Sequence, residues 1–359
     1  MKLEYLPYDL MLNHTWAISR SVATGGGSKL TSVVLVRLQD KSTTGLGEAP
    51  VSRRYAQSAA LIQDFLRLVD PNKLSFHDIP GSMAYLEKLA PNHSSAKCAL
   101  NVALVDGAAR QAGQPVYDLL GLGFTENKHV TSLSIGIDTP DMVRRKVAEA
   151  ASYPILKLKI GAPGDQENLA ALRQLDPQKT VRVDANEGWT TKEEALRQLE
   201  WLARDPHLEF VEQPMPASTP LPDLAWLKSR SPLPLFADES CHSARDISDC
   251  AQCYHGVNVK LLKTGGITGA HETLQAARQA GLKTMLGCMI ETSILITAAA
   301  HLAELTDHLD LDGNLLISND PFAGATASLG AVSFAAAPAK IGLRVKSRNA
   351  DPFGASVSS

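Results

Sequence analysis

The sequence predicts an α/β fold in which a parallel barrel follows a smaller α+β unit. From about residue 130 onward, short apolar runs alternate strictly with amphipathic stretches. This alternation is typical of strand–helix units whose strands pair in parallel. The first 125 residues lack it. Several of the apolar runs also end in a charged residue, as expected where the strands of a barrel open into one mouth.

The first unit, residues 1–125, begins with segments that predict a small antiparallel sheet: 3–12, 32–38 and 45–48. Helical periodicity follows in three segments: 56–68, 81–89 and a long one over 94–120. Residues 23–29, between the first two strands, contain three consecutive glycines but no phosphate-binding glycine pattern. We expect either a mobile flap over a site or a plain surface hairpin loop.

The second unit, residues 126–325, contains eight apolar runs: 133–137, 155–161, 181–186, 208–214, 233–239, 257–262, 283–290 and 308–312. Amphipathic helical stretches lie between them, among them 139–151, 191–203, 270–280 and 293–305. This order favours a parallel barrel. A doubly wound open sheet is the alternative, since the spacing alone allows it. We expect residues 326–359 to return and pack on the first unit.

Composition limits the classes of partner. With 359 residues, 44% of them hydrophobic, the chain can bury a large core. A net charge of −3 lacks the basic footprint of a nucleic-acid-binding protein. No apolar run approaches the roughly 18 residues of a membrane span, and the start lacks the apolar segment of a signal peptide. We therefore expect neither nucleic acid nor membrane as partner.

The cysteines form an odd, scattered set: Cys98, Cys241, Cys250, Cys253 and Cys288. That distribution favours a reducing cytoplasm over a disulfide framework. Cys250 and Cys253 form a CxxC pair, but a structural zinc needs four ligands and the sequence offers no second pair. We expect ordinary thiols here, with zinc or redox use as the minor alternative.

Three carboxylates end consecutive runs of the predicted barrel: Asp184, Glu212 and Asp238. Each alone is most simply a solvated loop acid. Together, at the ends of adjacent parallel strands, they meet in one mouth and offer the hard oxygen ligands that Mg²⁺ prefers. The sequence therefore predicts one Mg²⁺ per chain, with coordination positions left for a carboxylate substrate.

Lysines end the second and sixth runs, at Lys159 and Lys260, which lie across a barrel from one another. A carbon acid beside a carboxylate needs a metal to stabilise the developing charge, and a base. Lysine, with an ordinary pKa of about 10.4, becomes a better base when a nearby Mg²⁺ and neighbouring ammonium groups, such as those of Lys157 and Lys263, lower that pKa. Two opposed bases permit epimerisation, and one base permits syn elimination or cycloisomerisation. Charge balancing of the acids, or surface lysines, is the alternative.

Five segments resemble the muconate-lactonizing subgroup of the enolase superfamily, in which a lysine or histidine base works with Mg²⁺. They are residues 157–159, 184–186, 212–214, 237–240 and 260–266. The resemblance implies a modified TIM barrel, (β/α)7β, under an N-terminal α+β capping domain, and a homo-oligomer. It also implies that Lys159 and Lys260 are the acid/base pair and that the three carboxylates bind the metal. Segment 283–291 has no histidine, which argues against the mandelate racemase subgroup.

Asp310 and Asp312 resemble the DxD of dipeptide epimerases, where the pair holds the substrate's α-ammonium group. Alternate residues of an extended segment face the same way, which suits a cation between them. A solvated turn before Gly313 is the alternative. Arg20 resembles an arginine that meets an acidic side chain in Ala-Glu epimerases, although residues 25–29 depart from the family pattern. Glu291 either faces the pocket or supports a helix N-terminus.

The expected function is a cytoplasmic, Mg²⁺-dependent dipeptide epimerase that inverts the α-carbon of the C-terminal residue, with L-Ala-D/L-Glu as first guess. The small dipeptide would meet the expected substrate-binding residues Asp310, Asp312, Lys157, Arg20 and Glu291. The same fold also supports o-succinylbenzoate synthase, N-acylamino acid racemase or muconate cycloisomerase activity. A catalytically silent binding protein is the third possibility, which the presence of all five core residues disfavours.

Overall fold

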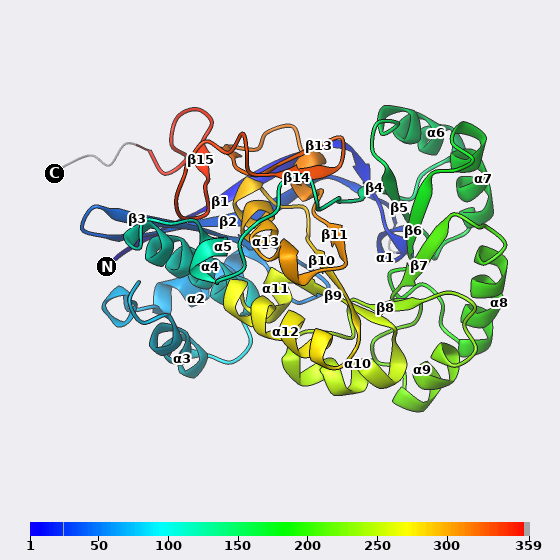
Figure 1. Cartoon of the computed structure of the whole chain (residues 1–359), viewed down its shortest axis with the longest axis horizontal. Helices are drawn as coiled ribbons and strands as arrows, with labels where there is room; N and C mark the ends of the chain where they lie inside the picture. Colours follow the sequence, from blue (N-terminus) through cyan, green and yellow to red (C-terminus); the bar gives the residue numbers. More distant parts are fainter. Residues whose placement is uncertain (24, 355–359) are drawn as a thin grey trace.

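The computed structural model describes residues 1–23 and 25–354. An antiparallel sheet of three strands and a parallel sheet of eight strands organise the chain. Figure 1 shows the blue strands and cyan helices of the N-terminal part on one side of the barrel, whose green and yellow helices form an outer layer. No helix of the described residues is long and apolar enough to cross a membrane.

The antiparallel sheet has the order β1-β2-β3, with β1 at Lys2–Trp16, β2 at Ser28–Asp40 and β3 at Thr43–Pro50. Strand β2 is buried on both faces because its side chains alternate between two cores. Val33 and Leu35 pack in the core shared with the barrel, and Val34 and Val36 pack in the core under the N-terminal helices. The predicted sheet is therefore confirmed, with longer strands than expected.

The N-terminal helices are α1 Ser19–Ala23, α2 Ala59–Leu68, η1 Pro71–Lys73, α3 Ile79–Leu89, α4 Ser94–Gln111 and α5 Val116–Leu119. The prediction of one helix over 94–120 was wrong, because Gly113 adopts a φ of 68° and Pro115 follows it. The predicted loop 23–29 is shorter than expected, since Ala23 ends α1 and Ser28 begins β2. Thr24, inside it, lies outside the described residues.

The eight predicted barrel strands are all present. They are β4 Leu133–Ile135, β5 Ile155–Lys159, β6 Thr180–Asp184, β7 Leu208–Glu212, β8 Leu235–Ala237, β9 Gly256–Lys260, β10 Lys283–Gly287 and β11 His308–Asp310. They pair in parallel in chain order, and a parallel bridge from Thr131 to Leu309 brings the two edges together. Sequential order with joined edges excludes the doubly wound alternative and confirms the barrel.

The helices between these strands cover the outside of the barrel (Figure 1). They are α6 Pro140–Glu149, α7 Asp165–Leu175, α8 Lys192–Leu202, α9 Leu221–Lys228, η2 Ala244–Asp246, α10 Ile247–Cys253, α11 Leu261–Thr264, α12 Ile267–Gln279, α13 Ser293–Ala300 and η3 Ala303–Leu305. The short η4 Gly313–Leu315, rather than an α-helix, follows β11. That ending matches the (β/α)7β barrel.

The last part of the chain contacts the N-terminal helices. It contains β12 Phe322–Ala323, β13 Thr326–Ser328, β14 Ala331–Ser333 and β15 Lys346–Ser347. The Leu343 amide donates to the buried Asp106 carboxylate of α4 at 2.7 Å. The same carboxylate accepts from the Leu46 amide of β3 at 2.9 Å. Asp106 therefore fixes the returning segment to both α4 and β3.

The CxxC pair lies on α10. Cys250 and Cys253 are buried, and their thiols donate to the carbonyls of Ser240 and Leu221 at 3.5 and 3.6 Å. All five cysteines are free thiols. Within the described residues, the group able to hold a metal ion is the carboxylate cluster and not this pair.

Candidate active site

Three carboxylates meet at the carboxyl ends of neighbouring barrel strands. Asp184 ends β6, Glu212 ends β7 and Asp238 directly follows β8. The β6–β7 ladder pairs Asp184 with Glu212. Ligand oxygens of the three lie within 4.8 Å of one another, and all three residues are fully buried.

Such a cluster of hard oxygen donors fits Mg²⁺, which takes carboxylate ligands and leaves other positions for substrate. The negative charges also repel one another. Burial, together with the nearby charges of Asp184 and Asp238, raises the pKa of Glu212 to about 7. A divalent cation among the three oxygens offsets both effects, so the residues present suit the predicted metal.

Four lysines surround the cluster, and they differ in burial. The side chains of Lys157 and Lys263 are 1% and 0% exposed. Lys157 Nζ contacts Asp184 at 3.2 Å, Glu212 at 2.7 Å and Asp310 at 2.6 Å. Lys263 Nζ donates to Asp238 Oδ1 at 2.7 Å and to two backbone carbonyls. Both therefore hold carboxylates in place, Lys157 from strand β5 and Lys263 from helix α11.

Lys159 and Lys260 lie at the more open side, 8% and 9% exposed, and each contacts one carboxylate of the cluster. Lys159 Nζ lies 2.6 Å from Asp184 Oδ2, and Lys260 Nζ lies 2.8 Å from Asp238 Oδ2. Their strands, β5 and β9, are the second and sixth in the order of the barrel sheet. The two ammonium groups therefore approach the carboxylate cluster from opposite walls.

The protein groups alone do not depress the pKa of Lys260, whereas the expectation from the sequence included the charge of a nearby Mg²⁺. Burial and the positive charge of Lys157 lower the pKa of Lys260, but Asp238, with Tyr55 and Glu212, raises it well above the ordinary value. The reason is direct contact: the carboxylate that lies 2.8 Å away stabilises the ammonium form more than a neighbouring cation destabilises it.

Asp310 and Asp312 are both buried, which excludes the solvated turn. Asp310 accepts from Ser132 Oγ and Lys157 Nζ, each at 2.6 Å. Asp312 accepts from the Ser134 amide at 2.6 Å. Burial and the neighbouring Asp310 charge raise the pKa of Asp312 to about 6. The pair is therefore an acidic site on the wall formed by β11 and β4, joined to the carboxylate cluster through Lys157.

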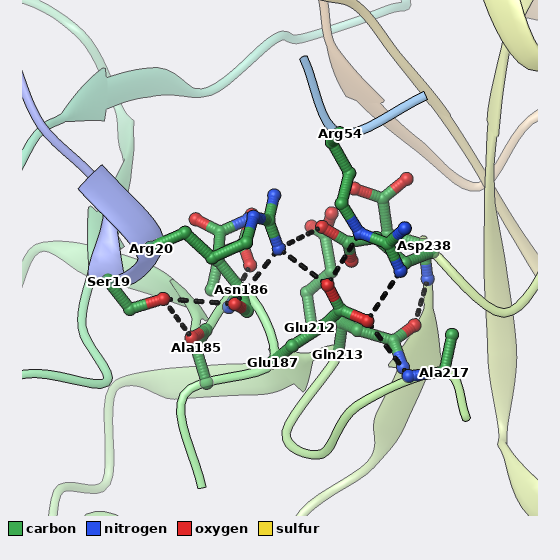
Figure 2. Close-up of polar contacts among 12 residues, drawn as sticks. Ser19, Arg20, Arg54, Ala185, Asn186, Glu187, Glu212, Gln213, Ala217 and Asp238 are labelled. Atoms are coloured by element: carbon green, nitrogen blue, oxygen red, sulfur yellow. Dashed lines mark hydrogen bonds and ion pairs between the residues drawn. The ribbon is translucent and has the colours of Figure 1, made fainter. Parts of the chain in front are cut away.

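Arg20 reaches the mouth from α1, where its Nη1 lies 2.8 Å from Glu187 (Figure 2). The same nitrogen lies 2.8 Å from Glu239. Glu291 is buried, but it lies outside the first turn of α13 and its Oε1 accepts from the Met289 amide at 3.0 Å. Burial raises the pKa of Glu291 to about 7 against the opposing charge of Lys260. Glu291 therefore does not cap the helix, and it is electrostatically coupled to the site.

The sequence reasoning missed several site residues. Asn258 precedes Lys260 by two residues on β9 and donates to Glu212 Oε1 at 2.9 Å. The two-residue alternation of a strand would have placed it on the same face as Lys260. Arg54, Glu187 and Glu239 lie in loops, and the sequence carries no periodic signal for them. The segment after β10 contains Cys288 and no histidine.

Two family descriptions match most of the chain. Residues 141–329 match the enolase C-terminal domain-like family. Residues 11–121 match the N-terminal domain of the mandelate racemase/muconate lactonizing enzyme family.

Similar proteins include an L-Ala-D/L-amino acid epimerase of Pedosphaera parvula, which is 61% identical over 97% of this chain and 100% of its own. A substrate-liganded L-Ala-D/L-Glu epimerase of Bacillus subtilis superposes with a TM-score of 0.88, at 27% identity, over 97% and 98% of the two chains. A dipeptide epimerase of Enterococcus faecalis, solved with Mg and L-Leu-L-Tyr, superposes with a TM-score of 0.87 at 27% identity. The match covers 96% of this chain and 99% of that chain.

Proposed function

Since the chain belongs to the mandelate racemase/muconate lactonizing enzyme family of the enolase superfamily, we propose that it is a Mg²⁺-dependent dipeptide epimerase. It inverts the α-carbon of the C-terminal residue of a dipeptide. The proposal is supported by its similarity to epimerases that act on L-Ala-D/L-amino acid and L-Ala-D/L-Glu dipeptides. L-Ala-L-Glu is therefore the first substrate to test.

The single observation that carries the proposal is the placement of two lysines on opposite walls around one acidic cluster. Asp184, Glu212 and Asp238 would hold the Mg²⁺. When bound, Mg²⁺ supplies a Lewis acid beside the substrate carboxylate, which makes the neighbouring α-carbon more acidic.

Lys159 and Lys260 carry the proton transfer in this proposal. One lysine, as the amine, removes the α-proton from one face, and the other, as the ammonium, returns a proton to the opposite face. In the reverse direction the roles exchange. The single carboxylate contact of each lysine leaves its ammonium group at the more open side of the site.

The remaining residues orient the dipeptide. Asp310 and Asp312 supply negative charge for the α-ammonium group. Lys157, between this pair and the metal carboxylates, balances their charge and holds them in place beside the substrate. In this proposal, Arg20 and Glu291 contact the substrate side chain.

We also propose where the enzyme lies in the cell, that it is an oligomer, and how the chain divides into domains. Five free thiols suit the cytoplasm. A homo-oligomer is supported by Met11 and Leu30, which pair across β1 and β2 and are 52% and 51% exposed. We propose 1–125 as capping domain, 126–325 as barrel and 326–359 as the returning segment.

Proton exchange followed by NMR tests the function. The protein is incubated in D2O with Mg²⁺ and L-Ala-L-Glu, then with pooled L,L-dipeptides. We expect the α-proton signal of the C-terminal residue to disappear and a diastereomer to appear. Exchange restricted to N-acyl amino acids, or no exchange in any dipeptide although Mg²⁺ binds, would contradict the proposal.

A further inference from the structure

The carboxylate of Glu187 joins two segments of the N-terminal part, helix α1 and the loop 52–57, to the mouth of the barrel (Figure 2). Its two oxygens accept from Arg54 Nε and Nη2, each at 2.7 Å. One of them also accepts from Arg20 Nη1 at 2.8 Å. Arg20 lies on α1, and Arg54 lies in the loop 52–57, which a backbone bridge from Ser52 to Gln57 closes. Glu187 is therefore a shared anchor for two segments that are distant in sequence.

The barrel side of this anchor has a fixed backbone. Asn186 and Glu187 adopt φ angles of 44° and 67°, which non-glycine residues keep only where the surroundings determine them. The Glu187 amide donates to the Gln213 carbonyl at 2.9 Å, and the Ala217 amide donates to the Glu187 carboxylate at 2.8 Å. These contacts aim the side chain at the two arginines.

The same anchor borders the metal carboxylates. The loop that carries Glu187 begins directly after Asp184. Arg20 Nη1 also lies 2.8 Å from Glu239, which follows Asp238 in the chain and is buried. The Glu187 side chain is 10% exposed, so its charge-assisted hydrogen bonds are partly shielded from water. Glu187 therefore both holds α1 and the loop 52–57 and lies beside the metal carboxylates.

We propose that Glu187 is a positioning residue that latches α1 and the loop 52–57 over the bound dipeptide. It does not contact the reacting carbon, and it acts through Arg20 and Arg54. The kinetic part of this inference rests on the proposed function, whereas the latch itself does not require any substrate.

Hydrogen–deuterium exchange of the full chain tests the latch without substrate. In Glu187→Gln we expect amides of residues 17–23 and 52–57 to exchange at least about tenfold faster, because the charge-assisted hydrogen bonds to Arg20 and Arg54 are lost. In Arg54→Gln only residues 52–57 should become faster, because Arg20 keeps its contacts. The matched control is Glu149→Gln, which removes an exposed contact from His14 to α6 at 2.6 Å. It should leave both loops protected.

Kinetics separates positioning from general damage to the fold. For Glu187→Gln we expect KM for the dipeptide to rise about tenfold while kcat stays within about threefold, because the proton-transfer groups are untouched. Glu149→Gln should keep both constants. An equal fall in kcat and kcat/KM would mean that Glu187 acts on the reaction itself, and would overturn the proposal.

Two further outcomes would also overturn it. One is unchanged exchange in both loops of Glu187→Gln. The other is release of both loops by Arg54→Gln, which would make them one unit with no need of a shared anchor. If Glu187→Gln does not fold, the exchange of Arg54→Gln tests the latch instead. Faster exchange in residues 52–57 alone supports it. If no dipeptide is epimerised, the proposed function fails, and the exchange data still test the latch.

Discussion

At the scale of single residues, burial separates the four lysines of the site into two roles. Lys157 and Lys263 satisfy several acceptors inside the barrel wall, and their ammonium groups are closed to solvent. Lys159 and Lys260 keep part of their surface at the open side. A proton-transfer group must reach the substrate, so the second pair suits that chemistry better.

Removing either lysine of the second pair should separate exchange from inversion. In Lys159→Ala or Lys260→Ala, we expect epimerisation to fall at least about a thousandfold, because one face has lost its proton-transfer group. The remaining lysine should still exchange the α-proton of one epimer. NMR in D2O, starting from each epimer separately, measures this. The two variants should show opposite preferences, and exchange of both epimers by either variant would contradict the two-base mechanism.

The acidic pair at the end of β11, Asp310 and Asp312, should determine recognition of the ammonium group. In Asp310→Asn and Asp312→Asn, we expect KM for a dipeptide to rise about tenfold to a hundredfold, because one charge-assisted contact is lost in each variant. Steady-state kinetics with L-Ala-L-Glu measures the change. The matched comparison is the N-acetylated dipeptide, which has no ammonium group. If KM for the N-acetylated dipeptide rises in the variants as much as KM for the free dipeptide, the pair does not bind the ammonium group.

At the scale of elements, His301 joins three segments at the end of α13. The Tyr117 amide, on α5, donates to its Nδ1 at 3.1 Å, and its Nε2 lies 3.1 Å from the Leu343 carbonyl of the returning segment. Burial lowers its pKa to about 3. The unfolded chain, with a histidine pKa of about 6.5, takes up a proton below that pH while the folded chain does not. Stability is therefore lost as pH falls from about 6.5 towards 3.

Urea unfolding at pH 7.5 and pH 5 checks this expectation. Below pH 6.5 we expect protonation of His301 in the unfolded chain to lower the unfolding free energy by up to about 1.4 kcal/mol per pH unit. His301→Asn, which does not titrate, should be less stable at pH 7.5 and should lose less stability on going to pH 5. Equal losses in the two proteins would show that His301 does not titrate between the folded and unfolded states as argued.

The elements that sequence reasoning placed well are those with a local signal. The barrel strands are continuous apolar runs, and five site residues are the last residues of strands: Lys159, Asp184, Glu212, Lys260 and Asp310. The break between α4 and α5 was missed because the helical periodicity continues across Gly113 and Pro115. The contacts of Glu187 with Arg20 and Arg54 depend on which loops the tertiary fold brings together, and no periodicity encodes that.

At the scale of the whole molecule, the N-terminal sheet and the barrel share one core. Leu10, Val33 and Leu35 belong to the same buried cluster as the barrel residues Val183 and Leu286. Glycines permit the close packing within the N-terminal part, since a Cβ on Gly47 would lie 2.0 Å from the Ala99 carbonyl of α4. The segments that cover the mouth, α1 and 52–57, are therefore carried by a part that is itself fixed to the barrel.

Metal binding should consequently stabilise the whole chain. The carboxylates come from β6, β7 and the residue after β8, and the lysines that hold them, Lys157 and Lys263, come from β5 and α11, so an unfolded chain does not assemble the site. At a Mg²⁺ concentration a hundred times its Kd, mass action adds about 2.7 kcal/mol to the unfolding free energy. Calorimetry in Mg²⁺ and in EDTA should show a Tm higher by a few degrees in Mg²⁺. The shift should disappear in Glu212→Gln and persist in Glu149→Gln, and an equal Tm of the wild type in both buffers would exclude the carboxylate cluster as a Mg²⁺ site.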